Sequence, residues 1–385
     1  MSTPKKFVLL GATGSIGAST LRVLRKHSDK LQLIGVSANS RARELADIVD
    51  EFDVAHAHLN RKIDDMPNFR EGTNLTFEAE ALDHLAAHPE AEIVVVALVG
   101  AAGLRPTLAA LEAGKKVVLA NKESLVVGGQ LITETARRTG GQIIPADSEH
   151  NAVFQCTMGQ PTNSLDSIIL TASGGAFRDL PVGELKNVTL KQALNHPNWL
   201  MGPKVTIDSA TMANKGLELI EAHWLFGLAP EKLEAVIHPP SIVHAFVRFV
   251  DGCCFAQLSP PSMTFALQNS LLHPKRFPGV EPTLDFSDPL DLSFSPPCLD
   301  RYPCLKLAQQ ALQEGGSAPL VFNAANELAV EAFQMNRIGF IQISSIIESS
   351  LSIMEPCNPK SLNELLDHDQ RVRRLASERI NSLSD

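Results

Sequence analysis

The first 150 residues alternate between short apolar runs and longer segments with helical periodicity. The apolar runs, each of a length that fits one buried strand, cover residues 7–10, 31–37, 93–99, 116–120 and 142–144. Helical patterns lie between them, as over residues 104–113 and 129–138. Strands and helices in alternation predict a parallel sheet with right-handed crossovers. We therefore expect an α/β fold that opens with a Rossmann-like parallel sheet in an N-terminal domain, residues 1–150.

The pattern changes after residue 150, where strands no longer alternate regularly with helices. Further apolar runs predict strands over residues 167–171, 204–208, 236–238, 242–250 and 254–258. The pair Asp251-Gly252 predicts a tight hairpin between the last two of them. We expect a central α+β catalytic domain with an open sheet over residues 151–271. Residues 272–303 are rich in Pro, Asp and Ser and predict a linker, and the pattern over 304–385 predicts a C-terminal helical bundle.

Composition narrows the class of protein. A chain of 385 residues is too long for one ordinary core, and its net charge of −9 argues against a general nucleic-acid binder. No apolar run reaches membrane-spanning length, and the first strand begins at Phe7, which leaves no room for a signal peptide. The six cysteines show no zinc-type spacing. We expect a cytoplasmic enzyme with reduced thiols, and neither nucleic acid nor membrane as its partner.

The turn after the first predicted strand carries a glycine at every third position: Gly11, Gly14 and Gly17. Glycines let the backbone approach a diphosphate closely, and the start of the next helix supplies amide donors and the positive end of its dipole. A glycine pattern alone is weak evidence, but this one joins the first strand to the first helix of an alternating chain. The turn therefore predicts dinucleotide binding, and a merely tight strand–helix turn is the alternative.

The end of the second strand indicates which dinucleotide to expect. An acidic residue there would accept the ribose 2′-hydroxyl of NAD, but this chain has Asn39-Ser40-Arg41. Ser40 can donate to a 2′-phosphate, and Arg41 can pair with it through its planar guanidinium. These residues favour NADP. The alternative is that Arg41 is an exposed residue in the first turn of a helix.

Polar residues also follow two later strands of the predicted sheet. Asn121, Lys122 and Glu123 follow one, and Asp147 and Glu149 follow the next. Ligands of open parallel sheets lie beyond the carboxyl ends of the strands, so we expect these clusters and the glycine turn at one edge. In extended chain Asp147 and Glu149 point to the same face, where Mg²⁺ or Mn²⁺ would relieve their repulsion. The alternative is an ordinary solvated loop.

Two features of the central domain predict a covered anion site. Ser173-Gly174-Gly175 follows a strand and can form an anion-binding nest of backbone amides with one hydroxyl. The loop 195–203 is rich in Pro and Gly, carries Trp199, one of the two tryptophans, and predicts a flap. The alternatives are an ordinary turn and a loop that one aromatic side chain pins to the core.

The segment 209–226 predicts a helix with polar groups on a mostly apolar surface. Asn214, Glu218 and Glu221 fall on one stripe, and apolar residues flank this stripe on both sides. Lys215 lies beside the stripe. Buried carboxylates and a buried lysine are costly without partners. Either a ligand or an internal Lys215–Glu218 salt bridge would supply such partners, and the segment alone leaves both possibilities open.

In chain order, these motifs resemble the family of 1-deoxy-D-xylulose 5-phosphate reductoisomerase, the NADPH-dependent enzyme of the non-mevalonate isoprenoid route. The resemblance covers essentially the whole chain, and the motifs are specific as a set although no single one is. The segments that carry it are Gly11–Gly17, Ala120–Val126, Asp147–Ala152, Ser173–Gly175, His196–Gly202, Asp208–Glu218 and His238-Pro239. The chain departs from the family at Asn39-Ser40-Arg41, where Gly-Lys-Asn is common, and at Leu200, where Ser is usual.

The resemblance implies NADPH and Mg²⁺ or Mn²⁺ as cofactors, a homodimer, and a role for each matching residue. It implies cofactor contacts for Gly11, Thr13, Gly14, Ser15, Ile16, Asn39, Ser40, Arg41, Asn121, Glu123 and Gly202. It implies substrate contacts for Lys122, Ser148, Glu149, Ser173, His196, Trp199, Ser209, Asn214, Lys215 and Glu218. It implies metal binding by Asp147, Glu149 and Glu218, which form the catalytic set together with Lys122.

The implied reaction fits these side chains. A cation on the three carboxylates would chelate the carbonyl and a neighbouring hydroxyl of 1-deoxy-D-xylulose 5-phosphate while a carbon–carbon bond breaks and re-forms. Hydride from NADPH would reduce the rearranged aldehyde to 2-C-methyl-D-erythritol 4-phosphate. Two other functions stay open: another NADP-dependent aldehyde or homoserine-type dehydrogenase, and a non-catalytic nucleotide-sensing protein.

Overall fold

The computed structural model describes residues 3–199 and 201–384, which form two compact units that we treat separately. The first unit comprises the chain up to Ser124, Ile132–Asn151 and Ser262–Thr283. The second comprises Leu125–Leu131, Ala152–Pro261 and the chain from Leu284 onward. These boundaries differ from the expected domains. Residues 262–283 join the first unit, and the C-terminal helices share the second unit with the central sheet.

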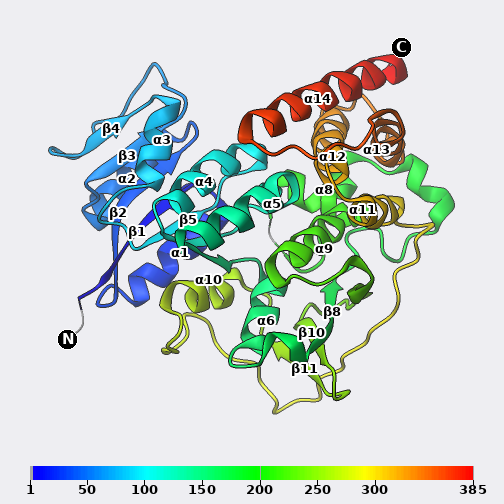
Figure 1. The fold of residues 1–385 in the computed structure, drawn as a ribbon, viewed down its shortest axis with the longest axis horizontal. Helices are drawn as coiled ribbons and strands as arrows, with labels where there is room; N and C mark the ends of the chain where they lie inside the picture. Colours follow the sequence, from blue (N-terminus) through cyan, green and yellow to red (C-terminus); the bar gives the residue numbers. More distant parts are fainter. Residues whose placement is uncertain (1–2, 200, 385) are drawn as a thin grey trace. The chain divides into compact units, whose positions relative to one another are not determined.

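A parallel sheet of seven strands forms the centre of the first unit (Figure 1), in the order β4-β3-β2-β1-β5-β6-β7. Its strands are β1 (Lys5–Leu10), β2 (Leu31–Ala38), β3 (His56–Leu59), β4 (Asn74–Thr76), β5 (Ile93–Val96), β6 (Lys116–Leu119) and β7 (Gln142–Pro145). The predicted parallel sheet is thus confirmed. The apolar pattern does not predict β3 and β4, because both are short and β3 has two histidines among its four residues.

Helices cover both faces of this sheet. They are α1 (Ser15–Lys26), α2 (Ala42–Phe52), α3 (Ala79–Ala86), α4 (Leu104–Glu112) and α10 (Met263–Leu272), while α5 (Lys122–Thr139) and α6 (Ser148–Thr157) contribute residues to both units. One core joins Phe7 and Leu9 of β1 with apolar residues of α1, α2 and α10. On the opposite face Gly35 of β2 lies against Leu85 of α3. Because α10 packs against α1 and buries Leu267 in this core, residues 262–283 belong to the first unit.

A mixed sheet of four strands forms part of the second unit, in the order β11-β10-β8-β9. Its strands are β8 (Leu165–Ala172), β9 (Leu233–Ile237), β10 (Val243–Phe249) and β11 (Cys254–Leu258). β8 and β9 are parallel, and the other two pairs are antiparallel. The predicted hairpin joins β10 to β11, with Gly252 in the left-handed region at φ +87°. The open sheet of the central segment is confirmed.

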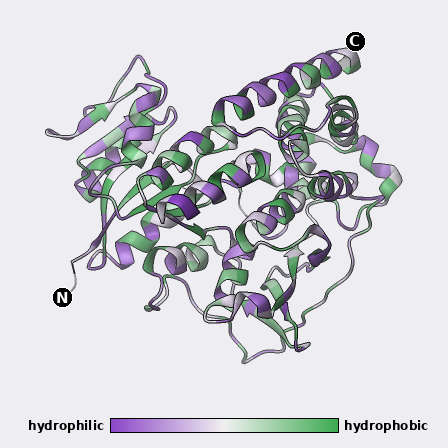
Figure 2. Ribbon diagram, in the orientation of Figure 1, coloured by the Kyte–Doolittle hydropathy of each residue, from purple (hydrophilic) through white to green (hydrophobic). Residues whose placement is uncertain are grey.

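The helices of the second unit pack on this sheet and on one another. They are α7 (Leu190–Ala193), α8 (Pro203–Thr211), α9 (Ala213–Phe226), α11 (Pro303–Glu314), α12 (Ala318–Gln334), α13 (Gln342–Ile353) and α14 (Leu362–Ser384). α9 packs against β8 and β9 on one side and against α11 on the other. Most residues of α12 are buried. Figure 2 shows that α14 is largely hydrophilic. The four C-terminal helices follow the predicted helical pattern.

The predicted strand over residues 204–208 is wrong, because these residues lie in α8. Val205-Thr206-Ile207-Asp208 alternates apolar and polar residues, as a strand does. Pro203 at the first helical position and Gly202 before it favour a helix start instead, and Ile207 and Asp208 are both buried. The described residues also form four short 3₁₀ helices: Gly100–Gly103, Thr162–Ser164, Val182–Asn187 and Pro230–Lys232. Within residues 3–199 and 201–384, no helix is long and apolar enough to cross a membrane.

Candidate active site

The glycine turn between β1 and α1 has the backbone that the sequence predicts. Gly11 adopts φ +88°, and a β-carbon there would lie 2.4 Å from the carbonyl oxygen of Ala97. A β-carbon on Gly17 would lie 2.2 Å from the carbonyl oxygen of Ala12. Gly14 precedes α1, and no described side chain caps this helix start, so its amides face the turn as available donors. The turn therefore fits a diphosphate group.

The residues after β2 lie at the surface of the first unit. Asn39 accepts a hydrogen bond from Nδ2 of Asn60 through Oδ1, at 2.9 Å. Arg41 precedes α2 and pairs with Glu44, Nη1 to Oε2 at 3.0 Å, with about half of each side chain exposed. Arg41 is thus an exposed residue at the start of a helix, as the alternative interpretation expects. The exposed guanidinium is also available to a 2′-phosphate, so that contact stays a prediction.

Asn121 has a structural role that the sequence did not predict. Its side-chain Oδ1 accepts the backbone N–H of Ser124 at 3.0 Å and so caps α5. Its Nδ2 donates to the carbonyl oxygens of Leu98 and Gly100, both at 2.9 Å, and to Glu123. Asn121 thereby ties the loop after β5 to the start of α5. The expected cofactor contacts of Asn121 and Glu123 stay predictions.

Asp147 and Glu149 do not share one face of a strand, so that expectation is wrong. β7 ends at Pro145, and α6 begins at Ser148. The carbonyl of Asp147 accepts the N–H of Asn151 at 2.8 Å, which places Asp147 just before the first helical turn and Glu149 within it. Acidic residues are stabilised at this end of a helix by its dipole. Both residues still lie beyond the carboxyl end of a parallel strand, as the sequence predicts.

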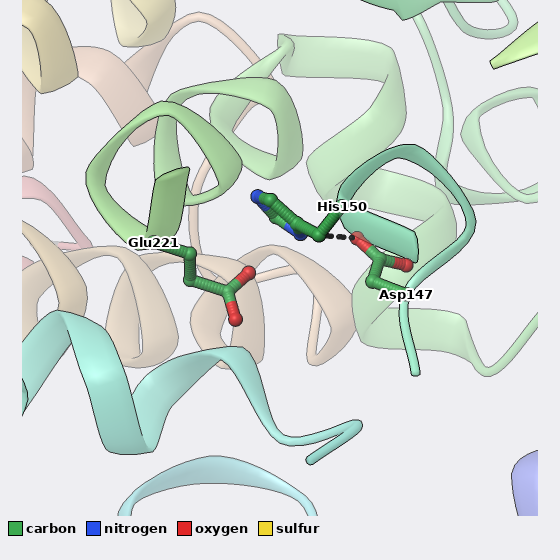
Figure 3. Close-up of side chains that lie close together, drawn as sticks. All are labelled: Asp147, His150 and Glu221. Carbon is green, nitrogen blue, oxygen red and sulfur yellow. Dashed lines mark ion pairs between the residues drawn. The ribbon is translucent and has the colours of Figure 1, made fainter. Parts of the chain in front are cut away.

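Asp147 is surrounded by positive and polar groups of its own unit. Oδ2 of Asp147 lies 2.6 Å from Nζ of Lys122 and 3.5 Å from Nδ1 of His150. Figure 3 shows the His150 ring beside the Asp147 carboxylate, and it also draws Glu221, which comes from α9. Burial alone would raise the pKa of Asp147, but the Lys122 ammonium and the His150 ring outweigh it and hold this pKa well below its usual range. Asp147 is therefore an anionic carboxylate over the pH range of enzymes.

In the second unit, two predicted substrate serines lie around the imidazole of a third predicted substrate residue, His196. Nε2 of His196 lies 2.9 Å from Oγ of Ser173 and 3.1 Å from Oγ of Ser209. Gly174 and Gly175 both have positive φ, at +84° and +68°, and the N–H of Gly175 donates to Oγ of Ser173 at 3.1 Å. The anion-binding nest of backbone amides stays a prediction. Burial, and then the charge of Arg178, lower the pKa of His196 to about 4, so its ring is neutral near pH 7.

The polar stripe on α9 is buried, as the sequence predicts. Lys215 and Glu218 are 2 % and 1 % exposed, and Glu218 accepts hydrogen bonds from both Lys215 and Asn214. The Lys215–Glu218 salt bridge of the alternative interpretation is therefore present. A ligand role for Lys215 and Glu218 stays a prediction. Glu221 on the same helix is 3 % exposed.

The flap residues on either side of Leu200 are described, whereas Leu200 itself lies outside the described residues. Trp199 is half-buried, and its ring centroid lies 6.4 Å from that of His244, edge to face. Gly202 precedes α8. The role of Trp199 as a cover for the substrate stays a prediction.

Family models match most of the chain. The model of 1-deoxy-D-xylulose 5-phosphate reductoisomerase matches residues 7–129, and that of its C-terminal domain matches residues 143–226. A third model, the DXP reductoisomerase C-terminal domain, matches residues 258–375. A 1-deoxy-D-xylulose 5-phosphate reductoisomerase of Ralstonia nicotianae is 45% identical over 384 residues, which cover 97% of this chain and 98% of the relative. The chain belongs to the 1-deoxy-D-xylulose 5-phosphate reductoisomerase family.

Other members of the reductoisomerase family agree in sequence and in structure. A relative from Geobacillus sp. is 46% identical over 377 residues, which cover 96% of this chain and 98% of the relative. A solved reductoisomerase from Zymomonas mobilis, in complex with NADPH, is 39% identical, with a TM-score of 0.90 and coverage of 98% of this chain and 100% of that one. A solved DOX-P reductoisomerase in complex with NADPH, fosmidomycin and magnesium has a TM-score of 0.91, 38% identity and coverage of 98% and 99%. As a reductoisomerase family member, the chain is an enzyme with a mixed α/β fold.

Two residues that the sequence did not single out form hydrogen bonds to the backbone of the turn Ser173–Gly175. The hydroxyl of Tyr302 donates to the carbonyl oxygen of Gly174 at 2.9 Å, and Nη1 of Arg178 donates to the carbonyl oxygen of Ser173 at 2.8 Å. Burial raises the pKa of Tyr302 to about 12, so its hydroxyl keeps the proton that it donates. Tyr302 is the one tyrosine in the sequence, which is the only signal that could have drawn attention to it.

Proposed function

We propose that the chain catalyses the metal-dependent rearrangement and NADPH-dependent reduction of 1-deoxy-D-xylulose 5-phosphate to 2-C-methyl-D-erythritol 4-phosphate, in the non-mevalonate isoprenoid pathway. The observation that carries this proposal is the group formed by Ser173, His196 and Ser209 beside two left-handed glycines. Two hydroxyls and a neutral imidazole suit a phosphate group, and a plain dehydrogenase does not need them.

For the cofactor, the proposed site is the glycine turn with the segment after β2. Its backbone fits a diphosphate, and two solved family members are described in complex with NADPH. Ser40 and Arg41 would favour the 2′-phosphate of NADPH over the 2′-hydroxyl of NADH. The proposed cofactor residues are Gly11, Thr13, Gly14, Ser15, Ile16, Asn39, Ser40, Arg41, Asn121, Glu123 and Gly202.

For the metal, the proposed ligands are Asp147, Glu149 and Glu218. Three carboxylates suit Mg²⁺ or Mn²⁺, and these three are a set that could hold a metal ion. Lys122 forms an ion pair with Asp147, and Lys215 forms one with Glu218. When bound, the metal would supply a Lewis acid that orients and polarises the carbonyl and hydroxyl oxygens of the substrate.

The chain's own side chains would do the remaining work. Lys122, held 2.6 Å from Asp147, would stabilise negative charge on a substrate oxygen or move a proton to it. Anchoring of the phosphate would keep the reacting carbons in register with the cofactor. The residues proposed to bind substrate are Lys122, Ser148, Glu149, Ser173, His196, Trp199, Ser209, Asn214, Lys215 and Glu218. We also propose a cytoplasmic homodimer, as the family resemblance implies.

The test is an assay of the purified chain with NADPH, Mn²⁺ and 1-deoxy-D-xylulose 5-phosphate. We expect loss of the absorbance of reduced nicotinamide in step with formation of the branched product, identified by NMR. Unphosphorylated 1-deoxy-D-xylulose is the control and should turn over far more slowly. Oxidation of NADPH with an unrearranged carbon skeleton would favour a simple dehydrogenase instead. Binding of NADPH without any turnover would favour a nucleotide-sensing protein.

A further inference from the structure

Residues 195–199, called the flap segment below, are joined to a distant turn by the side chain of Asn198. Nδ2 of Asn198 donates to the carbonyl oxygen of Pro239 at 2.5 Å and to Oγ of Ser241 at 3.0 Å. Pro239 and Ser241 belong to the turn that follows β9, far from the flap segment in sequence. In the described structure, these two bonds join the segment to this turn.

The turn that receives Asn198 is itself fixed. His238 is fully buried, and its Nε2 accepts the N–H of Val243 at 3.1 Å. Nδ1 of His238 donates to the carbonyl oxygen of Ser293 at 2.9 Å. The backbone N–H of His238 donates to the carbonyl oxygen of Ala172 at 2.7 Å. Ser241 is held at φ +55°, which is unusual for a residue other than glycine. The turn is therefore a rigid anchor for the flap segment.

The ring of His196 connects the flap segment to Ser173 and Ser209 through hydrogen bonds. Its Nδ1 accepts the backbone N–H groups of Asn198 and Trp199, at 3.1 and 2.9 Å. In a neutral imidazole one ring nitrogen accepts and the other carries the proton. The proton of His196 therefore lies on Nε2, which donates toward Ser173 and Ser209.

This donation decides what the hydroxyl of Ser173 can do. Its Oγ also accepts the backbone N–H of Gly175 at 3.1 Å. A hydroxyl oxygen has two lone pairs and one proton, so with both lone pairs engaged the proton is left to donate. A hydroxyl that can only donate suits an acceptor with no protons of its own, such as an ionised phosphate.

We propose that Asn198 is a positioning residue for phosphate recognition: by fastening the flap segment to Pro239 and Ser241, it keeps His196 in the tautomer that makes Ser173 a donor. The identity of the natural substrate rests on the proposed function, but the role of Asn198 in binding phosphate does not. Asn198 itself makes no contact with the hydroxyls of Ser173 or Ser209 among the described residues.

The test compares Asn198→Ala with Asn195→Ala, an exposed neighbour for which the described residues show no side-chain hydrogen bond. Two readouts are used: the KM for 1-deoxy-D-xylulose 5-phosphate, and the concentration of inorganic phosphate that half-saturates its thermal stabilisation of the enzyme. We expect Asn198→Ala to raise both by roughly tenfold, the effect of one to two lost hydrogen bonds. The KM for NADPH should stay unchanged, and Asn195→Ala should behave as wild type.

Ser241→Gly separates positioning from folding. Glycine accepts φ +55° without strain, so this variant should melt no lower than wild type. It still loses the hydroxyl that Asn198 binds, so its phosphate affinity should fall in the same direction as that of Asn198→Ala. Unchanged phosphate affinity in both variants, or a wild type that phosphate does not stabilise, would overturn the inference. A wild type that binds phosphate but does not turn over the substrate would instead contradict the proposed function.

Discussion

At the scale of single residues, Lys215 has two possible roles that one substitution separates. Its ammonium is buried against Glu218, so Lys215→Ala leaves a buried carboxylate without that charge and should lower the free energy of unfolding by about 3–5 kcal/mol. If Lys215 also binds phosphate, the KM for substrate rises as well. Lys232→Ala, which breaks an exposed pair with Asp166, is the control and should cost less than about 1 kcal/mol. Lower stability with an unchanged KM would leave Lys215 with the structural role alone.

The neutral His196 ring predicts how stability depends on pH. Its pKa is lowered to about 4 by burial and by Arg178, whereas an unfolded histidine titrates near 6.5. Between these values the unfolded state binds more protons than the folded state, so stability falls as the pH drops from about 6.5 toward 4. His196→Gln removes the titrating group and with it this pH dependence. Thermal unfolding should show a smaller fall from pH 7 to pH 5 in the variant, and an equal fall would show that His196 is protonated in the native enzyme.

Arg41 is the residue on which cofactor preference is predicted to depend. It pairs only with Glu44 in the described structure, at the surface, so its guanidinium can turn to a 2′-phosphate at little cost. Arg41→Ala should raise the KM for NADPH by about tenfold or more while that for NADH changes little. Steady-state kinetics with both cofactors would check this. Similar KM values for NADPH and NADH in the native enzyme would remove the basis for assigning Ser40 and Arg41 to the 2′-phosphate.

At the scale of elements, the approach of α9 to α11 depends on a glycine. A β-carbon on Gly216 would lie 2.3 Å from Cβ of Ala308, so the helices have to move apart to accept it. Gly216→Ala should therefore destabilise the enzyme by about 1–3 kcal/mol, despite the better helix propensity of alanine. Gly183→Ala, where nothing lies within 4 Å, is the control and should be nearly neutral. Because α9 carries Asn214 and Glu218, activity should also fall in Gly216→Ala at temperatures where it stays folded.

The sequence predicts elements well where local pattern and burial agree. β1 and α1 are of this kind, because a continuous apolar run meets a glycine turn that only a strand–helix junction explains. It fails where tertiary context decides: Asp147 and Glu149 read as extended chain but flank a helix start, and residues 204–208 alternate like a strand but belong to α8. The polar stripe of α9 could be predicted because buried polar groups are costly without partners, and Lys215 and Glu218 do partner each other. Asn198 and Tyr302 could not, since their roles depend on contacts with residues far away in the chain.

At the scale of the whole molecule, the proposed metal ligands Asp147 and Glu149 lie far from the third, Glu218, in the sequence. An ion that binds all three would therefore stabilise the folded enzyme as well as serve the reaction. At a free concentration one hundred times its Kd, the ion should add about 2.7 kcal/mol to the free energy of unfolding. Thermal unfolding over a series of Mn²⁺ or Mg²⁺ concentrations would measure this.

The same ligand set predicts that activity disappears with a chelator and returns with Mg²⁺ or Mn²⁺. Asp147→Asn, Glu149→Gln and Glu218→Gln should each lose most of the turnover and most of the stabilisation by metal, because each removes a negatively charged ligand. NADPH should still bind to all three variants, since the glycine turn is a separate element. Asp166→Asn, a change at an exposed carboxylate, should keep both activity and metal response. Full activity after verified removal of metal would contradict the metal site, and with it the proposed chemistry of rearrangement.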